Sequence, residues 1–160
     1  MQAALDAVRH YLGRARALVE LADDADLARR PAADMVPVGE QLAIAIEFAG
    51  RAVLPLAQRD SPAWPEPIAR ATLRAYADEM AAVLEELQLA DIGNHDVTHR
   101  AGFADVTQPA EDYLLRFALP NMVFHLTAAD AGLKGAGHAL GKADFDAIHA
   151  YPAGFTFSEE

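Results

Sequence analysis

The sequence has no cysteine and only two serines, Ser61 and Ser158. Without cysteine the chain forms no disulfide, binds no metal through thiolates and offers no thiol nucleophile. Neither serine stands in a Gly-x-Ser-x-Gly motif, and the chain also lacks a phosphate-binding glycine loop and a His-Glu-x-x-His motif. The usual signatures of serine, cysteine, nucleotide-dependent and zinc hydrolytic enzymes are therefore missing.

Positive charge is also scarce. Lysine and arginine total 13 against 24 acidic residues, which gives a formal net charge of −11. A nucleic-acid-binding protein neutralises phosphates with a basic patch, and anionic membrane surfaces attract basic segments. We therefore expect neither nucleic acid nor a membrane surface as a partner.

No long apolar run is present. The stretch Leu42–Leu56 is interrupted by Glu47, Arg51 and Pro55, and it is shorter than the roughly 20 residues that cross a bilayer. The first 21 residues carry five charged side chains, whereas a signal peptide has an uninterrupted apolar centre. These features predict a cytoplasmic protein.

Alanine, in contrast, is abundant. It accounts for 36 of the 160 residues, and it is the best helix former. Apolar residues make up 52% of the chain, and this length suffices to bury one core without disulfides or metal. The composition predicts one acidic, helical domain.

Four segments show the apolar spacing of amphipathic helices, in which three-residue and four-residue steps alternate. Prolines mark the limits of the second segment, since Pro37 fits a first helical turn and Pro55 must end or kink a helix. The predicted helices cover about 2–22, about 38–56, about 66–89 and about 109–135.

Two residues disturb the fourth predicted helix. Pro120 should bend it about one turn upstream, and Gly132 weakens it by about 1 kcal/mol relative to alanine. Before this helix, residues 91–108 lose the helical period, and Val97-Thr98 with Val106-Thr107 are compatible with a short hairpin. After it, residues 142–149 form only one weak helical turn.

These patterns predict an all-α four-helix bundle with a short irregular or hairpin insertion before the last long helix. Close approach of the helices is favoured by the many alanines. We assign residues 1–145 to the bundle and 146–160 to a C-terminal tail.

Helical bundles build sites from polar side chains that point inward. Asn121 lies on the apolar stripe of the fourth helix, and His125 follows one turn later on the same face. An i, i+4 pair suits two metal ligands, and histidine is a good ligand where asparagine is poor. The structural alternative is that Asn121 satisfies carbonyls freed by Pro120 and that His125 is a hydrogen-bonded core histidine.

The second helix supplies possible partners for His125. Gln41 and Glu47 flank its apolar stripe, and Asp34 lies just before it. A carboxylate facing His125 would form a minimal metal or acid–base site. His95 and His99 are also four residues apart, but their glycine- and asparagine-containing surroundings favour a loop, where this spacing loses its meaning.

Three blocks resemble the signature of the DUF1993 family, a group of uncharacterised bacterial proteins. The most specific is DYLLRFALPNMVFHLTAA at 112–129, and LGKADF at 140–145 is similar to the family's closing motif. The block ADMVP at 33–37, together with Gln41 and Glu47-Phe48-Ala49, resembles its second-helix block. The resemblance extends over about 1–145.

The resemblance implies a DinB/YfiT-like four-helix bundle. Metal-binding members of that superfamily hold nickel or zinc with one histidine on the second helix and a His-x-x-x-His pair on the last helix. Here Asn121 matches the first position of the pair, His125 matches the second, and the second helix has no histidine. A divalent nickel or zinc ion therefore remains only as a resemblance-based expectation, with His125 as its one matching ligand.

Three functions are compatible with these residues. The first is a small-ligand-binding bundle, expected to form a homodimer, in which Asn121, His125, Gln41, Glu47 and Asp34 are candidate ligand contacts. The second is a metal-dependent hydrolase or thiol transferase that uses a site around His125. The third is a structural or interaction protein whose buried polar pair fixes helix register.

Overall fold

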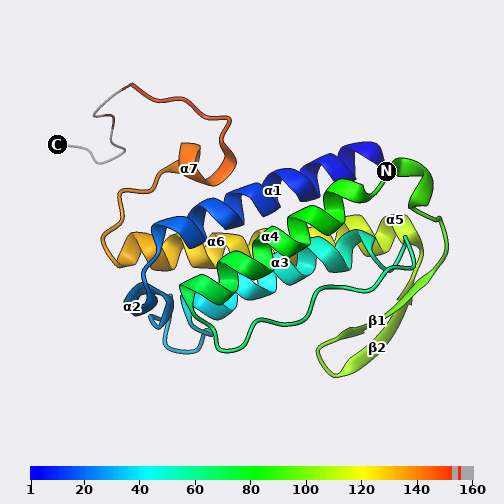
Figure 1. Ribbon diagram of the computed structural model, residues 1–160, viewed down its shortest axis with the longest axis horizontal. Coiled ribbons are helices and arrows are strands. Elements are labelled where there is room, and N and C mark those ends of the chain that lie inside the picture. The colour runs from blue at the N-terminus through cyan, green and yellow to red at the C-terminus, as the bar shows by residue number, and fades with distance from the viewer. Residues whose placement is uncertain (153–154, 156–160) are drawn as a thin grey trace.

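The computed structural model describes residues 1–152 and 155. Four long helices form the body of the protein: α1 (Gln2–Leu21), α3 (Val38–Val53), α4 (Arg70–Glu86) and α6 (Leu119–Gly135). They lie side by side along one axis (Figure 1). The predicted helical bundle is confirmed.

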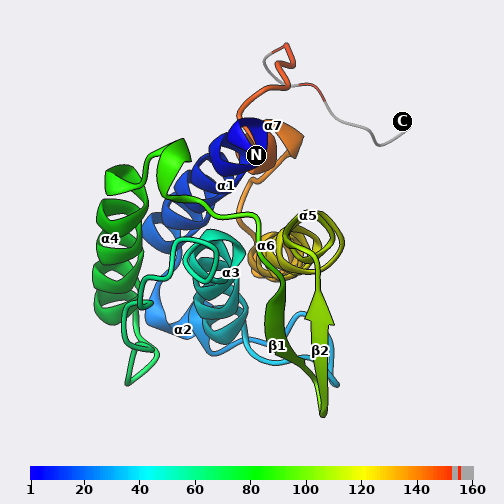
Figure 2. The same ribbon diagram turned by 90° about the vertical axis from the view of Figure 1, so that its right-hand side faces the viewer.

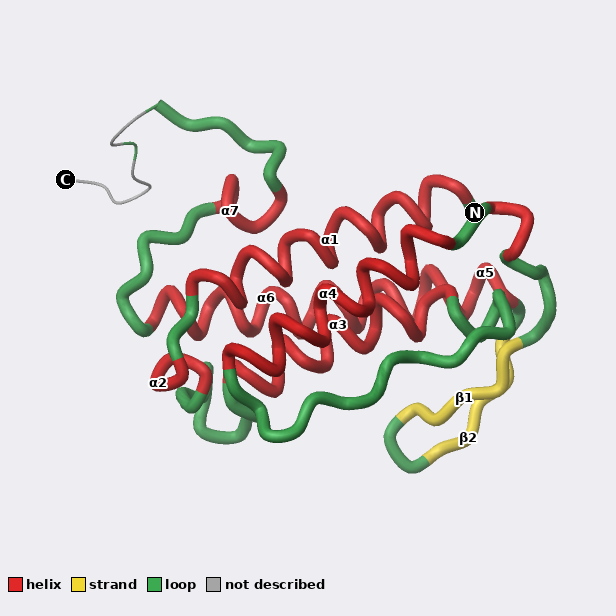
Figure 3. The backbone as a smooth tube through the Cα atoms, in the orientation of Figure 1, coloured by secondary structure: helices red, strands yellow, loops and turns green. Residues whose placement is uncertain are grey.

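The bundle contains one long crossover. Helices α3 and α4 run in the same direction, and α1 and α6 run in the opposite one (Figure 1). The segment 54–69 therefore returns along the length of the bundle, as the loop in Figure 3 shows. The end view in Figure 2 places α3 beside α1, α4 and α6, and its most extensive contact is with α6.

The central position of α3 follows from its composition. Most of its residues are buried, including Ala43, Ala45, Ala49 and Ala52, none of which is exposed. Small side chains let neighbouring helices approach closely, and the larger side chains of α1 then complete the core. The buried residues of α1 repeat at three- and four-residue steps: Leu5, Val8, Leu12, Ala15, Leu18 and Val19.

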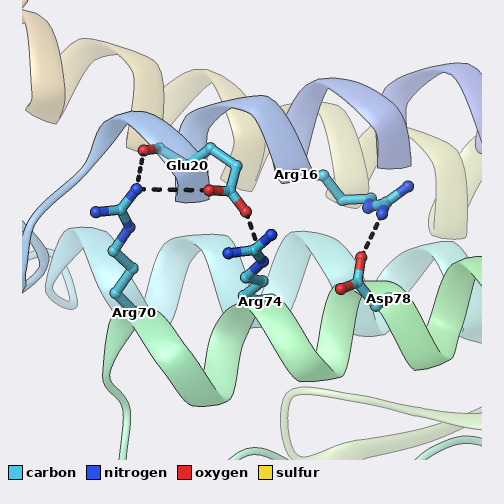
Figure 4. Close-up of polar contacts among 5 residues, drawn as sticks. All are labelled: Arg16, Glu20, Arg70, Arg74 and Asp78. Atoms are coloured by element: carbon cyan, nitrogen blue, oxygen red, sulfur yellow. Dashed lines mark hydrogen bonds and ion pairs between the residues drawn. The ribbon is translucent and has the colours of Figure 1, made fainter.

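Ion pairs link α1 to α4 on the outer surface. Arg16 contacts Asp78, and Glu20 contacts both Arg70 and Arg74, the latter at 2.9 Å (Figure 4). All five side chains are substantially exposed, and exposed ion pairs typically contribute about 0–1 kcal/mol each. These contacts therefore contribute little to the stability of the fold, which depends mainly on the buried core.

The third long helix is shorter in the structure than the sequence pattern predicts. The pattern extends over about 66–89, but α4 begins at Arg70 and ends at Glu86. A residue before proline is restricted to extended conformations, and Pro65 and Pro67 precede this start. Thr72 then caps the helix by accepting a hydrogen bond from the backbone N–H of Ala69 at 3.1 Å.

The acidic segment after α1 also differs from the prediction. The sequence predicts only that it ends the first helix, but it forms the short helix α2 (Asp24–Leu27). The side chain of Asp23 accepts a hydrogen bond from the backbone N–H of Asp26 at 2.8 Å. Aspartate is one of the preferred residues at this capping position.

The predicted hairpin is confirmed. Strands β1 (Val97–Ala101) and β2 (Ala104–Gln108) pair in antiparallel register, with Thr98 opposite Thr107. A short 3₁₀ turn, η1 (Leu89–Asp91), precedes the hairpin. The hairpin extends from the end of the bundle where the last helix begins (Figure 2).

The last long helix is interrupted as Pro120 predicts. It begins as α5 (Ala110–Asp112), continues as a π-helical segment η2 (Tyr113–Ala118), and becomes α6. In the π segment the N–H of Leu119 donates to the carbonyl of Leu114, five residues back. Proline lacks an N–H and its ring collides with the carbonyl four residues earlier, so the widened turn accommodates it.

The end of the described chain forms a short helix, α7 (Lys142–Asp146), rather than a turn through His149. The carboxylate of Asp146 accepts backbone hydrogen bonds from Ile148 and His149 and thereby ends the helix. Residues 153–154 and 156–160 of the predicted tail lie outside the described residues. Among residues 1–152 and 155, no helix combines the length and the apolar character needed to cross a membrane.

Candidate functional site

Gln41 and His125 meet between α3 and α6. The Oε1 atom of Gln41 lies 2.7 Å from Nδ1 of His125. Gln41 is the buried polar residue of α3, at 2% exposure. Since α3 and α6 run in opposite directions, the beginning of α3 faces the middle of α6 (Figure 1).

The hydrogen bonds of Gln41 identify which ring nitrogen of His125 carries the hydrogen. The Nε2 atom of Gln41 donates to the carbonyl of Val36 at 3.3 Å, so its Oε1 atom faces the imidazole and accepts. Nδ1 of His125 must therefore carry a hydrogen, and Nε2 of the neutral ring carries the lone pair.

Nε2 of His125 is accessible. It has no hydrogen-bond partner among the described residues, and it is not one of their buried unpartnered polar atoms, which are His99 Nδ1 and Asp130 Oδ1. Burial lowers the pKa of His125 below its ordinary value, because a low-dielectric environment disfavours the charged ring. The site therefore presents a neutral, oriented lone pair at neutral pH.

Asn121 is committed to its own helix. Its Nδ2 atom donates to the carbonyl of Phe117 at 2.7 Å. Asn121 and His125 share one face of α6, one turn apart. The structure thus gathers Gln41 and His125, with Asn121 beside them along α6.

Glu47 and Asp34 lie elsewhere. Glu47 is close enough to Tyr76 of α4 to raise the pKa of that phenol, although burial is the larger cause. Glu47 therefore faces α4 rather than α6. Asp34 is exposed in the turn between α2 and α3, so neither carboxylate joins His125.

Aromatic rings extend the site along the helices, and sequence reasoning missed them. The ring of Phe48 stacks on His125 at 6.0 Å and 13°, and Phe117 contacts Phe48 at 5.7 Å. Arg51 lies over both phenyl rings. The helical spacing of Gln41, Phe48 and Arg51 places them on one face, and this spacing was the available signal.

The two histidines of the hairpin region are separated. His99 lies in β1, where its Nε2 is 2.7 Å from Oε1 of Gln108 and its ring contacts Phe117 at 4.0 Å. His95 is exposed in the loop before β1. The ring of His99 packs against Tyr113 and Phe117, whereas His95 is exposed. The four-residue spacing therefore does not bring the two histidines together as a pair of ligands.

A separate hollow of about 450 Å³ lies where the N-terminus, the end of α4 and the start of the last helix meet. Its lining is mainly apolar and includes one carboxylate, Glu111. It contains none of the five candidate residues. Its lining residues are Met1, Ala4, Leu89, Ile92, Gly93, Asn94, Glu111, Leu114 and Leu115.

The residues around His125 do not fit the three-histidine metal site that the fold family implies. No group of three histidine, cysteine, aspartate or glutamate side chains suited to a metal occurs in residues 1–152 and 155. His125 offers Nε2, but its polar neighbours are the amides of Gln41, which bonds to its Nδ1, and Asn121, whose nitrogen donates to a backbone carbonyl. Neither amide is a good ligand for nickel or zinc. We therefore derive no chemistry from a metal here.

The comparisons with known proteins agree with the fold. A solved structure of a DinB family member protein from Shewanella denitrificans matches with a TM-score of 0.69 and 25% identity, over 93% of this chain and 88% of the other. No curated protein matches significantly. The family model described as "Domain of unknown function (DUF1993)" matches residues 1–146. The chain therefore belongs to the DUF1993 family and has a DinB-like helical fold.

Proposed function

We propose that the protein binds a small organic molecule at His125, whose Nε2 accepts a hydrogen bond from the ligand. The Gln41–His125 hydrogen bond of 2.7 Å carries this proposal. It fixes the tautomer and the ring orientation before any ligand arrives. Preorganisation of this kind reduces the ordering cost of binding.

The partner of His125 favours binding over proton transfer. Catalytic histidines commonly donate Nδ1–H to a carboxylate, which stabilises the imidazolium that forms when the ring takes a proton. Gln41 is neutral, and burial lowers the pKa of His125 further. Both effects make the ring a poor base but leave it a good acceptor.

A matched pair of probes tests the proposal. The probe 4-methylphenol has one O–H donor, and 4-methylanisole has the same ring with that hydrogen replaced by a methyl group. We expect the phenol to bind more tightly by about five- to tenfold, the equivalent of one hydrogen bond of about 1 kcal/mol. Nitrogen-15 NMR of the imidazoles should show a shift at His125 Nε2 for the phenol alone.

Two variants complete the experiment. His125→Phe should remove the preference for the phenol, whereas His95→Phe should keep it, because His95 is exposed and remote from the α3–α6 contact. Equal affinity for both probes, or an unchanged preference in His125→Phe, would contradict the proposal. Stoichiometric nickel or zinc in protein purified without a histidine tag, lost in His125→Phe, would favour the metal alternative instead.

A further inference from the structure

The tip of the hairpin carries a phenyl ring that the fold itself does not use. Phe103 is 99% exposed between β1 and β2. Because Ala101 pairs with Ala104, the loop consists of Gly102 and Phe103, of which Gly102 alone has a positive φ, of 60°. This is the pattern of a type II′ turn, which requires glycine at its first position but no aromatic residue at its second. The turn therefore does not account for Phe103.

The hairpin presents this ring on a hydrogen-bonded support. Across its strands, the hydroxyl groups of Thr98 and Thr107 are 2.9 Å apart. Helix α3 also holds it, because Nη2 of Arg51 donates to the carbonyl of Arg100 at 3.2 Å. Figure 2 shows the hairpin projecting from the body of the protein, so Phe103 is held away from the bundle.

The separate hollow of about 450 Å³ at the same end of the bundle is suited to such a ring. Its lining includes Leu114, which is buried, and Leu89 and Leu115, which are each 46% exposed. A cavity of about 150 Å³ is already large enough to hold benzene. A phenyl ring therefore fits in the hollow, where it would cover apolar surface that water now reaches.

The hairpin does not fill the hollow of its own chain. Residues of the segments 89–94 and 111–115 line the hollow, and these segments flank the hairpin at its base. Each strand has five residues, which at about 3.4 Å per residue places the tip roughly 17 Å from that base. Phe103 therefore reaches such a hollow only if the hollow belongs to a second copy.

The distribution of charge permits this contact between two acidic copies. The formal net charge of −11 makes two copies repel one another in general. The hairpin is an exception, because residues 97–108 contain one arginine and one aspartate, Arg100 and Asp105, which form an ion pair at 3.1 Å. Glu111 is the charged side chain in the lining of the hollow. A hairpin without net charge therefore approaches a mainly apolar hollow with little repulsion.

We propose that two copies associate by placing Phe103 of each in the hollow of the other. The homodimer expected from the sequence thereby has a defined interface, which is separate from His125. A buried phenylalanine removes about 150–250 Å² from water, so two such contacts, counted on both partners, bury about 600–1,000 Å². Stable interfaces bury about 1,200–2,000 Å². The dimer is therefore weak and forms at high protein concentration.

Sedimentation equilibrium over a range of concentrations measures the association. The mass of the wild type should rise toward that of a dimer, and Phe103→Ser should weaken the association by roughly tenfold or more. Serine suits a turn, so the hairpin should persist in this variant. Phe124→Ser is the matched control, because Phe124 is also exposed but lies in α6, outside the hairpin and the hollow. It should leave the association unchanged.

A second pair of variants tests the hollow. Leu115→Glu places a charge in its lining and should weaken the association. Leu21→Glu adds the same charge at the far end of α1, where the leucine is similarly exposed, and should not. A mixture of Phe103→Ser and Leu115→Glu keeps one intact contact, because the first variant supplies the hollow and the second supplies the ring. The mixture should therefore associate more strongly than either variant alone.

The wild type gives a direct readout that needs no variant. A sample mixed from isotope-labelled and unlabelled chains should show nuclear Overhauser contacts between the Phe103 ring and the Leu115 methyl groups, and their absence in an associating sample would overturn the proposal. A mass independent of concentration, or a mixture no stronger than its components, would also overturn it. Masses beyond the dimer would contradict the reciprocal pair, since a head-to-tail contact forms open chains. Binding to phosphatidylcholine vesicles that requires Phe103, without self-association, would assign the tip to a lipid surface instead.

Discussion

Replacing Gly132 with alanine should destabilise the protein, although alanine is the better helix former. Gly132 is buried in α6, and a Cβ atom there would lie 2.5 Å from Cγ2 of Val38 and 3.2 Å from Cγ of Pro31. Carbon atoms in contact are normally about 3.5–4.0 Å apart. Either Val38 must change its rotamer or α3 must move away from α6.

The size of the effect follows from two opposing terms. Overpacking a close contact costs about 1–3 kcal/mol, and replacing glycine by alanine within a helix gains about 1 kcal/mol. The valine side chain is stiff in a helix, so we expect a net loss of about 0–2 kcal/mol from these terms. A Cβ atom added at Gly13 in α1 would meet no atom within 4 Å, so Gly13→Ala should gain about 1 kcal/mol.

Urea unfolding followed by circular dichroism measures both changes. Gly13→Ala should raise the midpoint, and Gly132→Ala should not. Adding Val38→Ala to Gly132→Ala removes the colliding methyl group, so a double-mutant cycle should show favourable coupling. Because Val38 begins the helix that carries Gln41, Gly132→Ala should also weaken the Gln41–His125 hydrogen bond. Equal stabilisation by both glycine replacements, or a coupling of zero, would refute the reasoning.

Two further predictions concern the metal question and the dependence of stability on pH. The double variant Gln41→His/Asn121→His should bind one nickel or zinc ion in a metal analysis, because it places two more imidazoles beside His125. The control Glu47→His/Asn121→His should bind none, because residue 47 faces α4. Stoichiometric metal in the wild type or in the control would contradict the prediction. Backbone N–H groups that follow α7 are the main cause of the lowered pKa of Asp146, which is about 2. Because the pKa of Asp146 in the folded state lies below the ordinary 3.9, its ionised carboxylate stabilises the fold above about pH 4. This stabilisation is lost as the pH falls toward 2 and the carboxylate takes up a proton. The stability difference between the wild type and Asp146→Asn in urea should therefore shrink over that range, and a difference that grows would contradict this origin.

The helices could be predicted from the sequence because their apolar periodicity is local. The hairpin could be predicted for the same reason, since glycine and β-branched residues mark it. The short helix α2 was missed because its acidic residues resemble an end signal, whereas Asp23 caps a new turn. The π-helical form of η2 was not predictable either, because Pro120 requires a distortion but does not specify its geometry.

The site was only partly predictable because α3 is apolar on nearly all sides. Gln41 and Glu47 both flank its apolar stripe, but they are six positions apart, so their side chains point to different faces of the helix. Only the arrangement of the bundle decides that Gln41 meets His125 and that Glu47 faces α4. That choice also decides the chemistry. A carboxylate at the position of Gln41 would stabilise a protonated His125 and support proton transfer, and a histidine there would support a metal. The amide does neither, and it leaves His125 as a neutral hydrogen-bond acceptor at Nε2.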